Sequence, residues 1–462
     1  MKKIVFLVAF FSLMVSALQG QTSSMAQIPM PFQINKTIVR EYSYPATISY
    51  VETNEMHSFV YDDAMGTTPT VSIDKDYSVN DFVIEGDWLY FCGCYQGTSG
   101  FMGRFNIGDF FFNNQTYEIF PDSYISPTED VVTLTKLVNY TDGTYLHLLA
   151  IGETSLGASC VEDLYYIIST SSWQYQVGVL PLALGEKLLG VAVGEDYVVT
   201  AGLFRTTDRQ LYVRVAQKNA PFFTSTLDQY EFFDNGGPLY LHVRDELAIA
   251  SIGKIGTNDA FAVATIWDYH DLNNPGAQVA LSGKGIFVTP FSVNILLQAN
   301  PYNSSVTYQP YDTLGWSLQG MTRTSNYLND FVVLHRSQPF SGSPVQSIVS
   351  KYSWNTIVNA SSIPFWTTPD VSFHSIDWYN GGTQYVMNGI LGSDPAHMGV
   401  GIGATLSNDC MVQGHFQSEP VNMTNIVNDN VPFTVYSPVA TSETTLTGID
   451  EGEMPKSVDC KY

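Results

Sequence analysis

Charged side chains are scarce in this 462-residue chain, and positive ones are scarcest. Only 14% of the residues are Asp, Glu, Lys or Arg, and 44 acidic residues stand against 20 basic ones, a formal net charge of −24. Nucleic acids and anionic membrane surfaces bind clustered Lys and Arg and are repelled by a negative field. The composition argues against nucleic acid as a partner and fits a surface kept soluble by its own charge.

Long apolar runs are also missing beyond the first twenty residues, where no segment approaches the ~18 residues of a membrane-spanning helix. The early run, Ile4 to Val15, follows Lys2 and Lys3 and precedes the small residues Ser16 and Ala17. This order predicts a secretory signal peptide over 1–20. Its removal would leave 18 basic residues (20 minus 2) against 44 acidic ones, a net charge of −26. We expect a soluble bacterial protein that is secreted, periplasmic or held at the cell surface.

Complete catalytic motifs are absent as well. The chain has no His-Glu-x-x-His, no Gly-x-Ser-x-Gly and no Walker phosphate loop. The sequence therefore predicts no cofactor and no assigned catalytic residue.

Cysteine is rare, and five cysteines in an exported chain allow two disulfides and one thiol. Cys94 and Cys160 fall in predicted hairpins of adjacent repeats. Cys410 follows the last predicted third strand, and Cys460 lies near the end of the predicted tail. We expect the bridges Cys94–Cys160 and Cys410–Cys460, with Cys92 left as a buried thiol; the alternative is that all five are reduced or paired otherwise, since sequence does not fix connectivity.

The chain is rich in strand-forming and turn-forming residues, with 28 Tyr, 27 Phe, 36 Gly and 22 Pro. They form a sequence repeat of apolar strands separated by turns. A second strand that usually ends in glycine recurs about every 49 residues, within the range of repeat units that build propellers. Its seven copies end at Gly93, Gly152, Gly202, Gly253, Gln298, His335 and Gly389. A third strand follows each copy, and several alternate apolar and polar residues, as Leu211 to Val215 do, which indicates one packed and one wetter face.

This pattern predicts an all-β fold, a β-propeller of seven blades, with six or eight as alternatives. It resembles secreted bacterial β-propeller proteins in its repeat pattern only, because Trp-Asp, kelch and sialidase-type signatures are missing. The predicted domains are a linker over 21–40, the propeller over 41–436 and a tail over 437–462. Strands from both termini would close the ring: the stretches 47–51, 57–61 and 432–436 either complete the seventh blade or form an eighth. A set of separate β-sandwich domains is the alternative.

The resemblance to propellers implies that the first strand of each blade lines a central channel. Those strands would bring together Asp81, Tyr240, His242, His374 and Asp377. Carboxylates beside a histidine could cleave a glycoside or uronide by acid–base chemistry. Polar residues that only line a wet channel are the simpler interpretation.

Two further groups are candidates for binding. Trp316, Trp354, Trp378 and Tyr379 fall in or near loops, where flat rings could stack on sugars or anchor a protein, although such rings also fill space between blades. Asp74, Asp76, Ser78 and Glu85 have the spacing of calcium ligands in an EF-hand loop, but Val79 stands where that loop needs glycine.

The sequence therefore predicts a binding or interaction module with a glycan, peptide or surface-protein ligand outside the cytoplasm. The alternatives are a glycoside hydrolase or lyase with its site in the channel, and a structural component of a cell-surface assembly.

Overall fold

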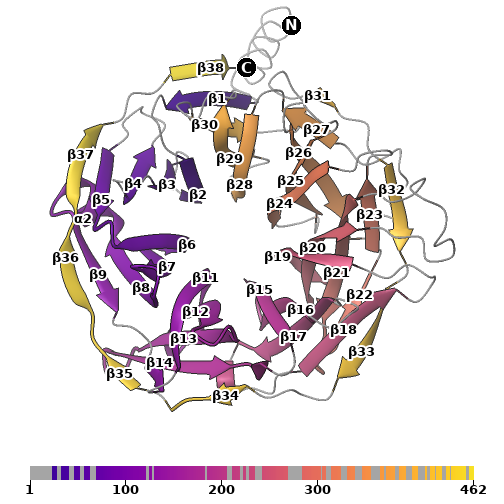
Figure 1. Cartoon of the computed structure of the whole chain (residues 1–462), viewed down its shortest axis with the longest axis horizontal. Coiled ribbons are helices and arrows are strands. Elements are labelled where there is room, and N and C mark those ends of the chain that lie inside the picture. Colours follow the sequence, from indigo (N-terminus) through magenta and orange to yellow (C-terminus); the bar gives the residue numbers. More distant parts are fainter. Residues whose placement is uncertain are drawn as a thin grey trace, which may run out of the picture.

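Strands dominate the computed structural model, and they form a ring of radially placed antiparallel sheets (Figure 1). The structure describes residues 23–461 apart from the connecting segments 29–32, 41–45, 53–56, 63–68, 121–123, 127–128, 183–184, 205–210, 219–221, 225–227, 235–241, 269–283, 303, 309–313, 324–329, 339–345, 355–364, 369–370, 380–383, 392–397, 404–411, 414–416, 422, 429–432, 438 and 454–456. Hydrogen bonds join the strands of this part of the chain into seven sheets, which we call blades 1 to 7. The all-β propeller architecture is thereby confirmed.

Blades 1 to 3 each run outward from the centre of the ring in four consecutive strands. Blade 1 contains β2 (Gln33–Arg40), β3 (Ala46–Glu52), β4 (His57–Asp62) and β5 (Pro69–Ile73). Blade 2 contains β6 (Tyr77–Glu85), β7 (Trp88–Tyr95), β8 (Ser99–Asn106) and β9 (Thr116–Phe120), with helix α2 (Ile107–Phe112) before β9. Blade 3 contains β11 (Glu129–Thr141), β12 (Tyr145–Thr154), β13 (Ser159–Ile167) and β14 (Ser172–Val179), with the short β10 (Tyr124–Ser126) beside β11.

Blades 4 to 6 repeat this order, and blade 7 takes its fourth strand from the N-terminal part of the chain. Blade 4 contains β15 (Glu186–Val193), β16 (Tyr197–Phe204), β17 (Leu211–Gln217) and β18 (Asp228–Asp234), with the 3-10 turn η2 (Phe222–Thr224) before β18. Blade 5 contains β19 (His242–Ile255), β20 (Asn258–Asp268), β21 (Lys284–Val293) and β23 (Ser304–Tyr308), with β22 (Ala299–Pro301) also on β21. Blade 6 contains β24 (Leu314–Arg323), β25 (Asp330–Gln338), β26 (Gln346–Ser353) and β27 (Phe365–Thr368). Blade 7 contains β28 (Val371–Tyr379), β29 (Gln384–Leu391), β30 (Met398–Gly403) and β1 (Ser23–Ile28).

A belt formed by residues 412–461 adds a fifth strand to the outer edge of every blade (Figure 1, yellow). It runs round the ring in the reverse of the blade order, from blade 6 down to blade 1 and then to blade 7. Its strands are β31 (Val412–Gln413), β32 (Gln417–Val421), β33 (Met423–Asn428), β34 (Thr434–Val435), β35 (Val439–Thr441), β36 (Thr444–Thr447), β37 (Ile449–Glu453) and β38 (Ser457–Lys461). Because β38 pairs with β1 in blade 7, strands from both ends of the chain meet where the ring closes, as predicted.

The predicted boundaries change accordingly. The segment 21–40, interpreted as a linker, contains β1 and β2, and the segment 437–462, interpreted as a tail, contains the last four belt strands. Neither stretch 47–51 nor 57–61 completes the seventh blade, because they form β3 and β4 of a blade of their own. The stretch 432–436 contributes β34 to the outside of blade 3. The predicted signal peptide lies outside the described residues.

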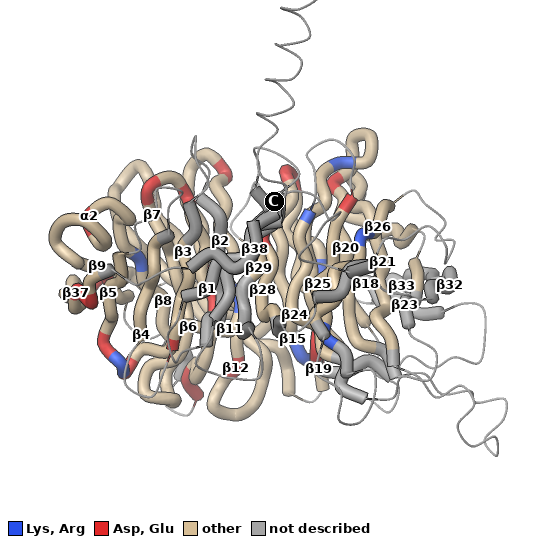
Figure 2. The backbone as a smooth tube through the Cα atoms, turned by 90° about the horizontal axis from the view of Figure 1, so that it is seen from above, with Lys and Arg blue, Asp and Glu red and all other residues tan. Residues whose placement is uncertain are grey.

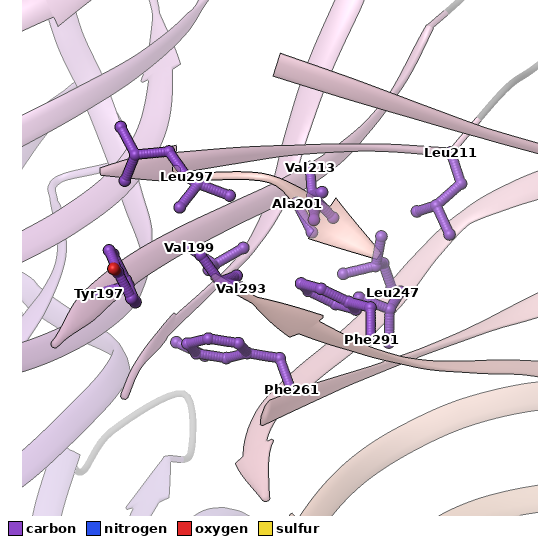
Figure 3. Close-up of a cluster of buried hydrophobic side chains, with 14 of the residues drawn as sticks. Tyr197, Val199, Ala201, Leu211, Val213, Leu247, Phe261, Phe291, Val293 and Leu297 are labelled. Atoms are coloured by element: carbon purple, nitrogen blue, oxygen red, sulfur yellow. The ribbon is translucent and has the colours of Figure 1, made fainter. Parts of the chain in front are cut away.

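The inter-blade spaces hold the hydrophobic core, as five clusters that each join two neighbouring blades. Figure 3 shows one of them, in which Val199 and Val213 of blade 4 face Phe261 and Phe291 of blade 5. The β-branched and aromatic residues of these strands suit a pleated surface that is buried on both sides. Packing between blades, and not within one central core, holds the ring together.

The prediction that one face of Leu211 to Val215 is exposed to water is wrong. Tyr212 is fully buried and Arg214 is 1% exposed, because blade 3 covers that side of β17. A guanidinium can be buried here because Arg214 donates to Glu186 across 2.7 Å, and both side chains are inaccessible to solvent.

The predicted Cys94–Cys160 bridge is not formed in the structure. Cys94 lies in β7 and Cys160 in β13, so neither sits in a hairpin tip as the sequence suggested. The Cys94 thiol donates to the Val132 carbonyl at 3.0 Å, and Cys160 is packed beside Cys92 in the cluster between blades 2 and 3. Burial raises the pKa of the Cys160 thiol, so it stays protonated. The predicted Cys410–Cys460 pair lies outside the described residues and side chains.

Candidate binding site in the central channel

The innermost strands share an irregularity that shapes the centre of the ring. In β6, β11, β15, β24 and β28 the pairing with the second strand skips one residue, a β-bulge. One skipped residue in each of these strands is Asn80, Thr135, Leu189, Gln319 or His374. A bulge bends its strand and redirects a side chain, and these five residues line the central cavity.

That cavity has a volume of about 580 Å³ and is bounded by the innermost strands of blades 2 to 7. The volume lies within the roughly 300–1,000 Å³ of ordinary ligand pockets. Charged groups of the lining include Lys136, Glu153 and Lys187. Aliphatic groups, among them Leu247 and Met321, line the same cavity. The channel is therefore amphipathic.

Polar side chains of one blade hold the backbone of the next blade around this cavity. Asp81 Oδ2 accepts a hydrogen bond from the Leu137 N–H at 2.8 Å, and Glu246 Oε2 accepts one from the Leu318 N–H at 2.7 Å. Between blades 3 and 4, Ser159 Oγ accepts from the backbone at 3.0 Å in the same way. A carboxylate that holds a buried amide stabilises the ring, because losing it would leave that donor unsatisfied.

Asp81 was predicted as a channel acid, and the structure gives it a different role. It does line the cavity, but it is only 5% exposed and its carboxylate is bonded to blade 3. It joins blades and is poorly placed to protonate a ligand.

The other predicted channel residues do not assemble into an acid–base cluster in the described part of the chain. His374 lines the cavity, but burial, helped by the positive charge of Arg336, lowers its pKa to about 4 and keeps the imidazole neutral. Asp377 follows in β28 and is not among the cavity-lining residues described. His242 begins β19, but its side chain lies outside the described part, as does all of Tyr240.

Several lining side chains keep hydrogen-bonding capacity after serving the fold. The Gln319 amide donates to Ser317 Oγ at 2.8 Å, which leaves its oxygen as an acceptor. The Asn80 amide nitrogen donates to the Leu134 carbonyl at 2.8 Å and likewise leaves an oxygen. Thr135 donates to the Ile151 carbonyl at 3.2 Å. Lys136 is exposed in the channel and adds a strong donor.

The aromatic candidates divide into two groups. Trp354 packs against the cluster between blades 5 and 6 and meets Tyr302 edge-on at 5.5 Å between ring centroids, so at least part of its surface fills space. Trp316, Trp378 and Tyr379 belong to β24 and β28, but their side chains lie outside the described part.

The four residues with the spacing of an EF-hand loop do not lie on one loop. Ser78 and Glu85 lie in strand β6, so Glu85 is carried roughly 23 Å along the strand from Ser78 at 3.3 Å per residue. Asp76 accepts from Gln96 at 2.8 Å, and Glu85 accepts from Asn139 at 2.8 Å, far from any common point. The described residues contain no group of three or more His, Cys, Asp or Glu placed to hold a metal ion.

Sequence reasoning missed Lys136, Glu153 and Gln319. The signal was present in the glycines that end the second strands. A Cβ on Gly93, Gly152 or Gly202 would lie 1.9, 2.1 or 2.2 Å from the carbonyl oxygen of Ser78, Thr133 or Lys187. Each of these carbonyls lies two residues before a bulge, so each glycine marks where the innermost strand turns a side chain into the channel.

None of the helices that the structure describes is long and apolar enough to cross a membrane.

Comparison with known proteins assigns this chain to no family. No protein-family model matches the chain, and no curated protein matches it. Among solved structures, the chain is similar to the WD40 domain of SCAP from fission yeast, with 9% sequence identity and a TM-score of 0.41, over 83% of this chain and 98% of that one. The fold assignment therefore rests on the strand pairing within this chain.

Proposed function

We propose that this protein is a secreted binding module whose central channel receives an extended peptide segment of a partner protein. The observation that carries the proposal is the chemistry of the cavity wall. Charged and amide groups line it together with aliphatic groups, which suits the mixed side chains and the repeating donors and acceptors of a peptide. The signal-like first twenty residues support export, and the strongly acidic composition fits a soluble protein.

Two observations set this role against the alternatives. Among the described residues that line the cavity there is no Phe, Tyr or Trp, and flat aromatic rings are the usual platform for sugars. Asp81 and Glu246 already accept backbone hydrogen bonds, and His374 is neutral, so the described cavity offers no assembled acid–base pair for cleaving a polysaccharide.

The test is a binding screen of the protein without residues 1–20 against a peptide library and a glycan array. We expect peptide binding, and the variant Lys136→Glu should weaken it about tenfold, equivalent to about 1.4 kcal/mol. The matched control is Lys75→Glu, the same charge reversal on an exposed turn outside the cavity, which should leave the affinity unchanged. Binding to glycans alone, or release of sugar products, would contradict the proposal.

A further inference from the structure

The belt is attached to a ring that is complete without it. Blades 1 to 6 each possess four strands from consecutive chain, and blade 7 obtains its fourth strand from β1. Four strands per blade is the ordinary propeller unit, so closure does not require a fifth. In the described part of the chain, every belt strand pairs with a blade strand and none pairs with another belt strand. The belt therefore has the geometry of a bound extended ligand.

This binding has the form of strand addition, in which backbone hydrogen bonds supply affinity and side-chain pockets supply specificity. The register is defined at both ends of the belt. Thr367 of β27 lies opposite Val412, and Ser24 of β1 lies opposite Lys461. Strand edges that would otherwise be open to any extended chain are thus covered by one particular segment.

The belt carries a buried aromatic side chain that anchors it to the ring. Phe433 is only 7% exposed, packs 5.7 Å from Phe223 between ring centroids, and lies under the Arg214 guanidinium at 5.0 Å. It thus covers the buried Arg214–Glu186 pair between blades 3 and 4. A side chain so placed excludes water from a charged pair and should contribute much of the binding energy.

A second set of anchors holds the belt on blades 1 and 2. Glu443 pairs with Arg104 at 3.2 Å, and Glu451 accepts from Ser72 Oγ at 2.8 Å. Gly448 donates to the Gln115 carbonyl at 2.8 Å, and a Cβ there would lie 2.6 Å from the Ser72 carbonyl oxygen. The rim thus binds particular side chains of the belt, and at position 448 it leaves room only for glycine.

We propose that the outer rim of the ring is a strand-docking surface whose occupant is exchangeable: residues 412–461 of the same chain, or the same segment of a second copy. Exchange of an identical element between copies is a low-cost route to dimers, and along the chain the belt follows β30 of blade 7. Such exchange would link rings through their belts.

The experiment uses the folded full chain with a protease site introduced in 404–411. After cleavage, a fluorescent peptide of residues 412–462 is added in excess, and its incorporation is followed by anisotropy and gel filtration. We expect the labelled peptide to replace the resident belt while circular dichroism stays unchanged. In competition, Phe433→Ala in the peptide should weaken incorporation about tenfold, whereas Val439→Ala, at a residue 46% exposed, should have an effect below about twofold.

Two results would overturn the proposal. If the ring stays folded and never takes up the peptide, the belt is a permanent part of the fold; if cleavage unfolds the ring, the belt belongs to its core.

Exchange between copies is tested on uncut protein at high concentration. Belt-linked dimers should form, and cleavage in 404–411 followed by excess peptide should convert them to single rings. Finding only monomers would refute exchange between copies.

Discussion

Two buried histidines show how differently neighbouring groups can act on the same side chain. Burial alone would lower the pKa of His147, but the hydrogen bond at 3.0 Å to Asp163 and the charges of Asp163 and Asp142 outweigh it and raise that pKa. His335 shares a hydrogen bond with Ser350 Oγ at 3.0 Å, and burial lowers its pKa to about 3. The fold therefore favours the charged form of His147 and keeps His335 neutral at neutral pH.

The raised pKa of His147 has a predictable effect on stability. A group whose pKa is higher in the folded state than its usual ~6.5 stabilises the protein fully below that pH and loses its contribution as the pH rises through the folded value. We expect the melting temperature to fall over this window, and the free energy of unfolding to change by at most about 1.4 kcal/mol per pH unit from this group. Thermal melts between pH 5.5 and 9, with NMR titration of His147, check this.

The variant Asp163→Asn removes the nearest carboxylate and should lower the pKa of His147, while Asp74→Asn, on an exposed turn, should not. A His147 that titrates at or below its ordinary value in the unaltered protein would show that burial prevails over the two carboxylates.

At the scale of elements, the second-strand glycines and the bulges opposite them form one unit. Gly152→Ala would place a Cβ within 2.1 Å of the Thr133 carbonyl oxygen, so β11 or β12 must shift. Forced overpacking of this kind costs about 3 kcal/mol. We expect that loss of unfolding free energy in urea titrations, together with disturbed channel binding, since Thr135 follows in the same bulge.

Gly108→Ala is the matched control, because its Cβ in helix α2 would meet only Asn106 Oδ1 at 3.4 Å. It should change stability by less than about 1 kcal/mol, since alanine is favoured over glycine in helices. Equal losses for the two variants would mean that the close approach at Gly152 is relieved at little cost.

The sequence allowed the propeller to be predicted, but not the assignment of every repeat. Leu247 to Gly253 looks like a second strand because it is apolar and ends in glycine, yet it belongs to the innermost strand β19, and Ala248 and Ile249 face the cavity. The stretch 294–298, interpreted as another second strand, follows the end of β21 and pairs with no blade strand. Apolar runs alone cannot separate a strand buried between neighbours from one that lines an amphipathic channel.

The site was predictable only in outline. His374 and Asp81 were placed correctly on innermost strands, but whether Asp81 is available to a ligand depends on the Leu137 amide of the next blade, which no local pattern reveals. The belt was missed because its strands are only two to six residues long and show no repeat of their own.

At the scale of the whole molecule, the ring and the belt should differ in how readily they open. The side view places β37 at the periphery (Figure 2), and Val439 and Ile449 of the belt are 46% and 67% exposed. Inner strands such as β12 and β16 are hydrogen-bonded on both sides and buried between blades. Few buried contacts and edge hydrogen bonds are the features of segments that open locally.

We therefore predict two tiers of amide hydrogen exchange under native conditions. Amides of β35 to β37 should exchange at least about a hundredfold faster than those of β12 and β16, because opening the belt exposes little apolar surface and leaves every blade with four strands. Exchange measured by mass spectrometry on peptides from 436–453 and 145–154 distinguishes the tiers. The variant Arg104→Ala, which removes the partner of Glu443, should speed exchange around β36 and leave β12 unchanged. If the belt and β12 instead exchange at one rate, they open as a single cooperative unit. The fifth strand would then be required for the ring to fold.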